Sequence, residues 1–181
     1  MELVDVYNKR HEKLNYTKGR RDLTNGEYKL SCFVWIINDE NQILIQQRLA
    51  TAKKCPNMWS TTGGGAKAGE DSITGTLTEL EEELEITLNK KALTFIGSFI
   101  RFNDFVEIFV ANINIDINNI KIAKDEVQDV KWVTIDGYVE MIENVEAVPT
   151  SFNIFKNYYQ KYYKNRIKKS SVYQFIIKNI L

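Results

Sequence analysis

Seven acidic side chains follow a glycine-rich stretch in the middle of this chain, and no Lys or Arg lies among them. They fall within residues 68–89: Glu70, Asp71, Glu79, Glu81, Glu82, Glu83 and Glu85. On a helix, Glu79, Glu82 and Glu83 share one flank, because residues three and four apart are neighbours. Like charges at this spacing destabilise a helix by roughly 0.2–0.5 kcal/mol per pair. A bound divalent cation would reverse that penalty, whereas a solvated acidic face would simply carry it.

The glycines strengthen the metal interpretation. Residues 63–65 are all glycine, and Gly69 follows shortly before the expected helix. Glycine lets the backbone approach a ligand closely and turn sharply, and either Asp71 or Ser72 can cap the helix. Carboxylates bind Mg²⁺ or Mn²⁺, and such ions neutralise diphosphate oxygens and activate water. Glycines and acids together therefore indicate a metal and diphosphate site.

This stretch resembles the Nudix box, Gly-x5-Glu-x7-Arg-Glu-U-x-Glu-Glu-x-Gly-U, where U is a bulky aliphatic residue. The positions that match in register are Gly64, Glu70, Glu79, Leu80, Glu82, Glu83 and Ile86. Thr78 stands where the family has Arg, and Glu85 where it has Gly. The family's Arg orients the Glu that follows it, and Thr78 is too short and uncharged to do so. The family's Gly ends the helix in a left-handed turn, which Glu85 would enter only with strain.

The resemblance implies roles for the acids. Glu82 and Glu83 would be ligands of Mg²⁺ or Mn²⁺, and Glu79 would be a ligand or would orient the attacking water. The backbone carbonyl of Gly63 would be a further ligand. Glu126, in the acidic stretch 125–129, is the candidate general base, with an ordinary surface acid as the alternative.

A basic segment precedes the glycines and could hold phosphate oxygens. Residues 48–62 are expected to form a loop, and solvated loop charges are the alternative interpretation of its bases. Similar bases precede a Pro-x-x-Trp in Nudix proteins that resemble isopentenyl diphosphate isomerase, so the resemblance covers roughly residues 20–135. The candidate substrate-binding residues are Arg48, Lys53, Lys54, Gly64 and Gly65.

The implied activity is Mg²⁺-dependent hydrolysis of a nucleoside diphosphate linked to another moiety. One alternative is isopentenyl diphosphate isomerase, which uses a Cys and a metal-binding His where this chain has Gly63 and Gly65. Another is a Nudix-fold module that binds nucleotide or RNA and has lost catalysis, motivated by Thr78 and Glu85. Because the chain keeps every helix carboxylate of the box, hydrolysis is favoured.

Composition bounds the fold. With 181 residues, 44% of them hydrophobic, the chain can bury one substantial core, and we expect a single domain over residues 1–181. The only histidine is His11, which disfavours a His-based metal site. Cys32 lies in an apolar strand pattern and Cys55 in a polar loop, so no structural disulfide is expected. Without a membrane span or signal peptide pattern, a cytoplasmic protein is expected.

Charge is unevenly distributed although the formal net charge is zero. Residues 148–181 hold seven bases and no acid, which leaves 17 bases and 24 acids in the other 147 residues. Aromatic residues recur every three or four positions in the same segment. We favour a helix that docks its aromatic side on the acidic body; a homodimer contact and an RNA-binding surface are the alternatives. The bases are Lys156, Lys161, Lys164, Arg166, Lys168, Lys169 and Lys178.

Hydrophobic patterning predicts an α/β protein. Combined with the resemblance, it gives a Nudix α/β/α sandwich with a mixed, curved sheet between helices. The stretch from Tyr28 to Ile37 is apolar on both alternating faces toward its C-terminal end. This pattern is typical of a central strand that is buried on both sides. The other expected elements are an irregular or hairpin extension over 2–27, strands over 42–47, 94–102, 106–115 and up to 133, and helices over 71–86, 135–142, from 151 and over 172–180.

Overall fold

The computed structural model describes residues 2–149 and 151–162. In chain order its elements are β1 (Leu3–Tyr7), β2 (Lys13–Gly19), β3 (Lys29–Ile37), β4 (Gln42–Arg48), β5 (Trp59–Ser60), β6 (Thr62–Gly65), α1 (Ser72–Leu84), η1 (Lys90–Ala92), β7 (Leu93–Arg101), β8 (Asp104–Asn112), η2 (Ile117–Asn119), β9 (Val127–Thr134), α2 (Ile135–Glu143) and α3 (Phe152–Tyr162).

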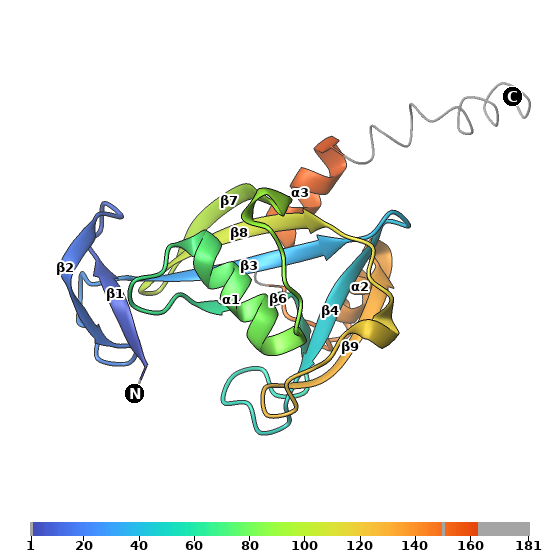
Figure 1. The fold of residues 1–181 in the computed structure, drawn as a ribbon, viewed down its shortest axis with the longest axis horizontal. Helices are drawn as coiled ribbons and strands as arrows, with labels where there is room; N and C mark the ends of the chain where they lie inside the picture. The colour runs from blue at the N-terminus through green and yellow to red at the C-terminus, as the bar shows by residue number, and fades with distance from the viewer. Residues whose placement is uncertain (1, 150, 163–181) are drawn as a thin grey trace, which may run out of the picture.

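β3 is the centre of a seven-stranded mixed sheet (Figure 1). On one side it pairs in parallel with β8 along its whole length, from Lys29 opposite Asp104 to Ile37 opposite Asn112. Its other side is shared: β6 pairs with the first half of the strand, and β4 with only its last two residues. β4 and β6 therefore share the same edge of β3, each along a different part of it.

The glycines lie in a strand and not in the loop that the sequence suggested. Gly63, Gly64 and Gly65 belong to β6 and pair with Phe33, Cys32 and Ser31 of β3. The predicted loop 48–62 is likewise interrupted by β5, which pairs with β4. Glycine is unfavourable in strands. Here a Cβ at Gly63 would meet the backbone of β3, and a Cβ at Gly64 or Gly65 would displace the side chain of Glu79 or Arg20. The sharp turn predicted after the glycines falls at residues 66–71.

Helices cover both faces of the sheet, which confirms the predicted α/β/α sandwich. Because neighbouring strand residues point to opposite faces, Cys32 and Val34 pack with Leu80 and Leu84 of α1. Trp35, on the other face, packs with side chains of α2 and α3. Figure 1 shows α1 in front of the sheet, with α2 and α3 behind it.

Residues 2–27 form the expected hairpin, β1 and β2, which is a separate two-stranded sheet at one end of the molecule (Figure 1). Backbone groups attach it to the turn between β6 and α1. The amide of Ala68 donates to the carbonyl of Leu3 over 2.9 Å, and that of Gly69 to Asp5 Oδ2 over 2.8 Å. The hairpin therefore borders the glycine strand.

The remaining sequence expectations have mixed outcomes. The hairpin β7–β8, the strand β9 and the helix α2 lie close to their predicted positions. Cys32 is buried, Cys55 is exposed and both are free, as expected. The predicted helix 172–180 and five of the seven C-terminal bases lie outside the described residues. Within the residues that are described, no helix is long and apolar enough to cross a membrane.

Candidate active site

α1 is held at both ends by local bonds. At its start the carboxylate of Asp71 accepts from the amide of Thr74 over 2.7 Å, so Asp71 is the capping residue. At its end Glu85 adopts the left-handed conformation, with φ 50° and ψ 32°, and its amide donates to the carbonyl of Glu81. The strained turn expected where the family pattern has Gly is therefore present.

Two of the helix acids, Glu79 and Glu83, turn toward β6 and form what we call the inner pair. Glu83 is only 7% exposed, and its Oε2 accepts from Gln46 Nε2 of β4 over 2.7 Å. Glu79 packs on the strand itself: a Cβ at Gly64 would lie 2.2 Å from Glu79 Oε1. Gly64 is thus required for Glu79 to lie where it does.

The inner pair is electrostatically unfavourable without a cation. Burial raises the pKa of Glu79 to about 8, and the charge of Glu83 adds to this effect, while Arg20 opposes it. Burial also raises the pKa of Glu83 to about 7, against hydrogen bonds from Gln46 and the backbone of Gly63. Two adjacent carboxylates inside the protein favour a positive ligand, because each one penalises ionisation of the other.

A third acid approaches from outside α1. Glu126 lies in the exposed turn before β9, and its charge raises the pKa of both members of the inner pair. The turn is attached to α1, since the amide of Ala123 donates to the carbonyl of Glu83 over 3.0 Å. The structure therefore brings Glu79, Glu83 and Glu126 toward one another from a helix and a loop 40 residues further along the chain.

The other helix acids, Glu81, Glu82 and Glu85, form an outer group in which each has its own partner. Glu82 pairs with Lys67 over 2.5 Å, Glu81 accepts from Thr87 Oγ1 over 2.5 Å, and Glu85 pairs with Lys121 over 2.9 Å. Glu82 was expected beside Glu79 and Glu83, but its side chain is 47% exposed and turned to Lys67.

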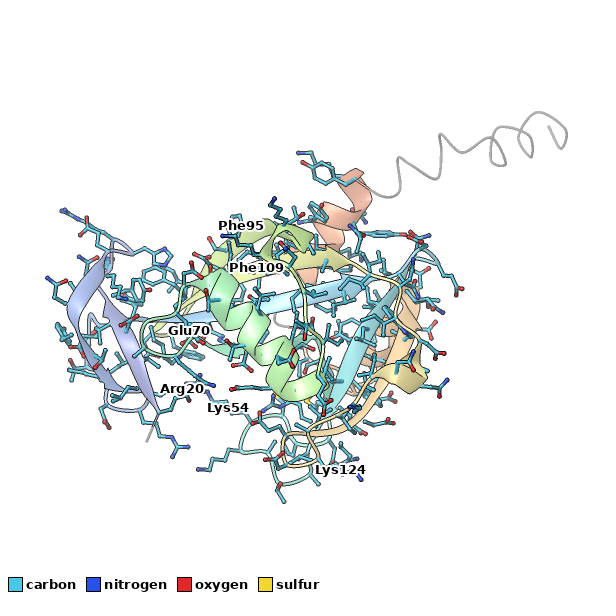
Figure 2. All side chains as sticks on the ribbon, in the orientation of Figure 1. Arg20, Lys54, Glu70, Phe95, Phe109 and Lys124 are labelled. Carbon is cyan, nitrogen blue, oxygen red and sulfur yellow. The ribbon has the colours of Figure 1, made fainter. Side chains whose placement is uncertain are left out.

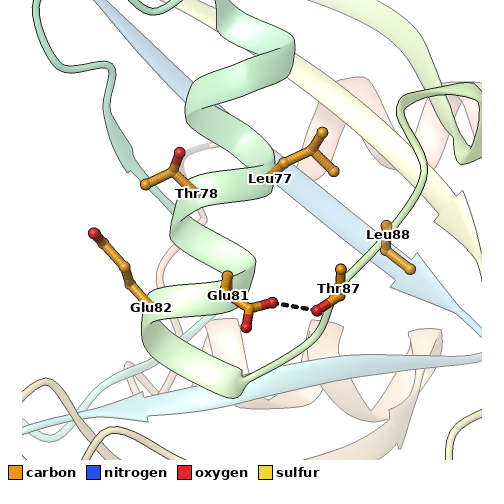
Figure 3. Close-up of a pocket in the computed structure, with 6 residues that line it drawn as sticks. All are labelled: Leu77, Thr78, Glu81, Glu82, Thr87 and Leu88. Carbon is orange, nitrogen blue, oxygen red and sulfur yellow. Dashed lines mark hydrogen bonds between the residues drawn. The ribbon is translucent and has the colours of Figure 1, made fainter.

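An open groove of about 460 Å³ follows the outer flank of α1 (Figure 3). Thr78 and Glu82 form part of its lining, and the bond between Glu81 and Thr87 lies at its side. This groove is separate from the inner pair, neither of whose members lines it. Its lining residues are Leu77, Thr78, Glu81, Glu82, Thr87 and Leu88.

The donor set suits a hard divalent cation, although the side chains are not arranged around one. Among residues 2–149 and 151–162, no three His, Cys, Asp or Glu side chains converge closely enough to hold a metal ion. The inner pair and Glu126 nevertheless supply the carboxylate oxygens that Mg²⁺ and Mn²⁺ prefer. The raised pKa values of the inner pair fit the same group, because a cation would remove their mutual penalty.

Of the basic candidates, Arg48 ends β4, and Lys53 and Lys54 lie in the loop between β4 and β5. Arg48 Nε donates to the carbonyl of Lys54 over 3.0 Å, and the charge of Arg48 lowers the pKa of Glu83. Lys53 and Lys54 are exposed. Lys54 lies close enough to Lys29 for its charge to help lower the pKa of Lys29, together with burial and the neighbouring arginines. Arg48 thus approaches the inner pair, whereas Lys54 is joined to Arg48 by the bond to its carbonyl and Lys53 only shares its loop.

Sequence reasoning missed two residues at the site. Gln46 is 3% exposed and holds Glu83; a polar residue after Ile43, Leu44 and Ile45 in a buried strand was a signal, because buried amides need partners. Arg20 donates from Nη2 to the carbonyl of Gly65 over 2.7 Å. Figure 2 shows Arg20 between the N-terminal hairpin and α1. Nothing in its local sequence distinguishes it from neighbouring surface bases.

The family model described as NUDIX domain matches residues 27–155. The chain belongs to the NUDIX family. The Nudix box expected from the sequence accordingly corresponds to β6, α1 and the turn between them.

Known proteins are similar at modest identity. Nudix hydrolase 3 of Arabidopsis thaliana is 28% identical over 87% of this chain, which spans only 22% of that protein. An uncharacterized Nudix hydrolase of Listeria monocytogenes is also 28% identical, over 84% of this chain and 91% of its own length. The crystal structure of DR0079 from Deinococcus radiodurans has a TM-score of 0.70 at 19% identity and covers 86% of this chain and 98% of that one, so it supports the fold alone.

Proposed function

We propose that this chain hydrolyses the diphosphate bond of a nucleoside diphosphate linked to another moiety, with Mg²⁺ or Mn²⁺. The single observation that carries the proposal is the inner pair, half-buried Glu79 and buried Glu83, packed against the glycine strand with the charge of Glu126 nearby. Membership of the NUDIX family supports the same reaction class. A bound divalent ion would neutralise the non-bridging oxygens and make water easier to deprotonate.

The residues of the chain have separate tasks in this reaction. Glu79 and Glu83, together with Glu82 and the carbonyl of Gly63, are the proposed metal ligands. Gln46 fixes the Glu83 carboxylate by the bond to its Oε2. Gly64 and Gly65 were expected to bind substrate, but the space over them is taken by Glu79 and Arg20, so their proposed task is to let these two side chains pack against β6.

The protons and electrons balance in a simple hydrolysis. The oxygen of water forms a bond to one phosphorus while the bond from that phosphorus to the bridging oxygen breaks. The electron pair of the broken bond leaves with the bridging oxygen on the second phosphate. Glu126 is the proposed acceptor of the water proton. Arg48, Lys53 and Lys54 are proposed to bind the phosphate oxygens, since their loop adjoins the site and brings positive charge to it.

Isopentenyl diphosphate isomerisation is a second candidate, and the geometry at Gly65 argues against it. A Cβ at residue 65 would lie 2.2 Å from Arg20 Nη2. A histidine at this position would therefore displace Arg20. The matching test is incubation with isopentenyl diphosphate and Mg²⁺, in which no dimethylallyl product is expected; robust product formation would overturn the hydrolase assignment.

The decisive experiment for hydrolysis is a substrate screen. Nucleotide sugars, ADP-ribose, dinucleoside polyphosphates, oxidised dNTPs and NADH should be incubated with Mg²⁺ while nucleotide or phosphate release is measured. At least one compound should be turned over by the wild type, and Glu83→Gln should lower that turnover by about 10²-fold or more. A folded wild-type protein that binds a nucleotide but cleaves none of them would instead support a binding module.

A further inference from the structure

Thr78 occupies the place of the family's Arg, but its hydroxyl is already bonded elsewhere. It donates to Glu70 Oε1 over 2.8 Å, and Glu70 Oε2 accepts from the amide of Lys67 over 2.7 Å. Thr78 thus fixes the turn between β6 and α1. Because α1 contains no basic residue, no side chain of this helix can donate a charged hydrogen bond to Glu79.

The open edge of β6 provides another place for such a donor. The amide of Ala66 donates to the carbonyl of Leu30, so this pair is hydrogen-bonded across the two strands. Backbone groups alternate in direction along an antiparallel strand, and those of Gly63 and Gly65 therefore point away from β3. The N–H of Gly63 bonds to Glu83, and the carbonyl of Gly65 accepts from Arg20. Arg20 and the inner pair thus meet at one strand edge.

Close packing fixes both groups against adjacent glycines. Arg20 Nη2 lies 2.2 Å from where a Cβ of Gly65 would be, and Glu79 Oε1 lies 2.2 Å from that of Gly64. Because neighbouring strand residues point to opposite faces, the two groups flank β6 from its two faces, with the open edge between them. The other end of the guanidinium is held by Glu2, whose Oε2 lies 3.2 Å from Arg20 Nη1. Arg20 Nε is buried and has no hydrogen-bond partner among the described residues, so one donor is still available to a nearby carboxylate.

Arg20 comes from a part of the chain that the family match does not include. It directly follows β2, whereas the match begins at residue 27. The hairpin is fixed to the site by the backbone bonds of Ala68 and Gly69, and the amide of Arg20 donates to the carbonyl of Glu2 over 3.0 Å. These hydrogen bonds hold the N-terminal hairpin, and with it the guanidinium of Arg20, beside β6.

We propose that Arg20, supplied by the N-terminal hairpin, is a positioning residue that orients Glu79 in place of the Arg that Thr78 replaces. The inference rests on the proposed function, because it assigns Glu79 to the reaction. Arg20 acts on the carboxylate from the strand edge, whereas the family's Arg would act from the helix.

The first test needs neither metal nor substrate. In metal-free protein at about pH 9.5, above the pKa of about 8 of Glu79, Arg20→Ala should lower the Tm more in the wild-type background than in Glu79→Gln, since the second variant has no charge to orient. In the Glu82→Gln background the loss should equal that in wild type, because Glu82 is turned toward Lys67. Such a cycle isolates the pairwise interaction. Additive losses for Arg20 and Glu79 would overturn the proposal.

The second test uses turnover of the best diphosphate from the screen. Among the described residues no hydrogen bond or ion pair joins Arg20 to Glu79, so the interaction is that of a nearby charge. Loss of this charge predicts that Arg20→Ala lowers kcat about 10- to 100-fold with little change in KM. Arg20→Lys should keep part of the activity. Adding Thr78→Arg to Arg20→Ala should restore kcat several-fold, whereas Thr78→Arg alone should not increase it. The matched control is Arg21→Ala, an exposed neighbour at the end of the same hairpin.

The outcomes separate this inference from the proposed function. If the wild type cleaves no diphosphate, the proposed function fails, while the Tm cycle still decides whether Arg20 and Glu79 interact. If the wild type is active and Arg20→Ala keeps its kcat, the inference fails and the proposed function stands. A kcat loss that Thr78→Arg and Arg20→Lys both fail to reduce would show that Arg20 only anchors the hairpin.

Discussion

The inner pair and the outer group contain the same residue type on the same helix, yet their surroundings differ completely. Each outer acid is exposed and has a partner in Lys67, Thr87 or Lys121. In the inner pair Glu83 is buried and Glu79 half-buried, and loss of solvent raises the pKa of both carboxyl groups. The electrostatic penalty of the acid-rich helix therefore falls mainly on two side chains, Glu79 and Glu83. Charge counts along a helix locate an acidic segment, but burial decides which acids need a ligand.

The largest expected effect comes from removing one inner carboxylate. Glu83→Gln should lower kcat by about 10²-fold or more, because it removes an electrostatic contact to the reacting group. Glu82→Gln should cost a similar factor if Glu82 leaves Lys67 to bind metal, as the motif implies. Glu81→Gln, the control from the outer group, should stay within about two-fold of wild type.

Steady-state kinetics at several Mg²⁺ concentrations would check this prediction, with circular dichroism to confirm folding. Near wild-type rates for Glu83→Gln at low Mg²⁺ would remove the distinction between the two groups. A normal rate for Glu82→Gln alone would assign Glu82 to the outer group in function as well as in position.

The second effect is a pH dependence of stability in metal-free protein. The folded pKa values of Glu79 and Glu83 lie above the ordinary value of 4.5, at about 8 and 7. Between about pH 4.5 and 8 the unfolded chain therefore holds fewer protons than the folded one. The free energy of unfolding should fall as pH rises through this window, by at most about 1.4 kcal/mol per pH unit for each group.

The measurement is the Tm in EDTA at pH 5.5 and 8.5. Wild type and Glu81→Gln should both melt several °C lower at pH 8.5, since about 1 kcal/mol corresponds to roughly 2–4 °C at this size. The Glu79→Gln, Glu83→Gln double variant should lose most of that difference. An equal slope in the double variant would place the responsible groups elsewhere.

A smaller effect concerns the end of α1. Glu85 adopts a left-handed conformation that a non-glycine residue enters at a cost of roughly 1–2 kcal/mol. After allowing for the extra backbone entropy of glycine, Glu85→Gly should stabilise the protein by about 1 kcal/mol, or roughly 2–4 °C in Tm. Glu85→Ala is the control, because it removes the exposed ion pair and keeps the strain. A lower Tm for glycine than for alanine would contradict this account.

The smallest effect tests whether Lys67 competes with metal for Glu82. This exposed pair is worth about 0.2–1 kcal/mol. Lys67→Ala should therefore reduce the Mg²⁺ concentration for half-maximal rate by no more than about five-fold. Lys121→Ala, which frees Glu85 in the same manner, should leave that concentration unchanged. A higher Mg²⁺ requirement in Lys67→Ala would show that Lys67 assists the site.

The sequence predicted the layers of the fold because each depends on local pattern. The two-faced apolar stretch from Tyr28 to Ile37 indicated the central strand, and the helical spacing of Leu80 and Leu84 indicated the side of α1 that packs on it. The glycine strand was missed, because three glycines carry no strand propensity. Glycine at these positions accommodates the backbone of β3 and the side chains of Glu79 and Arg20, tertiary contacts that local patterns do not reveal.

The candidate site was predictable in part for the same reason. Motif spacing located Glu79 and Glu83, which are neighbours on one helix. It also grouped Glu82 with them, because helical spacing takes no account of Lys67, which lies outside α1 and forms an ion pair with Glu82. Gln46 and Arg20 reach the site from β4 and from the N-terminal hairpin. Contacts of this kind depend on the tertiary arrangement, so neither role follows from local sequence.

The parallel pairing of β3 with β8 has a consequence for how the chain folds. The paired residues, such as Lys29 and Asp104, are 75 positions apart, and closing so long a connection is entropically costly and slow. During synthesis β3, β4, β6 and α1 all emerge before β8. One edge of an apolar central strand therefore stays open until about residue 112 has been made. We expect this interval, in which exposed strand edges promote aggregation, to limit the yield of folded protein.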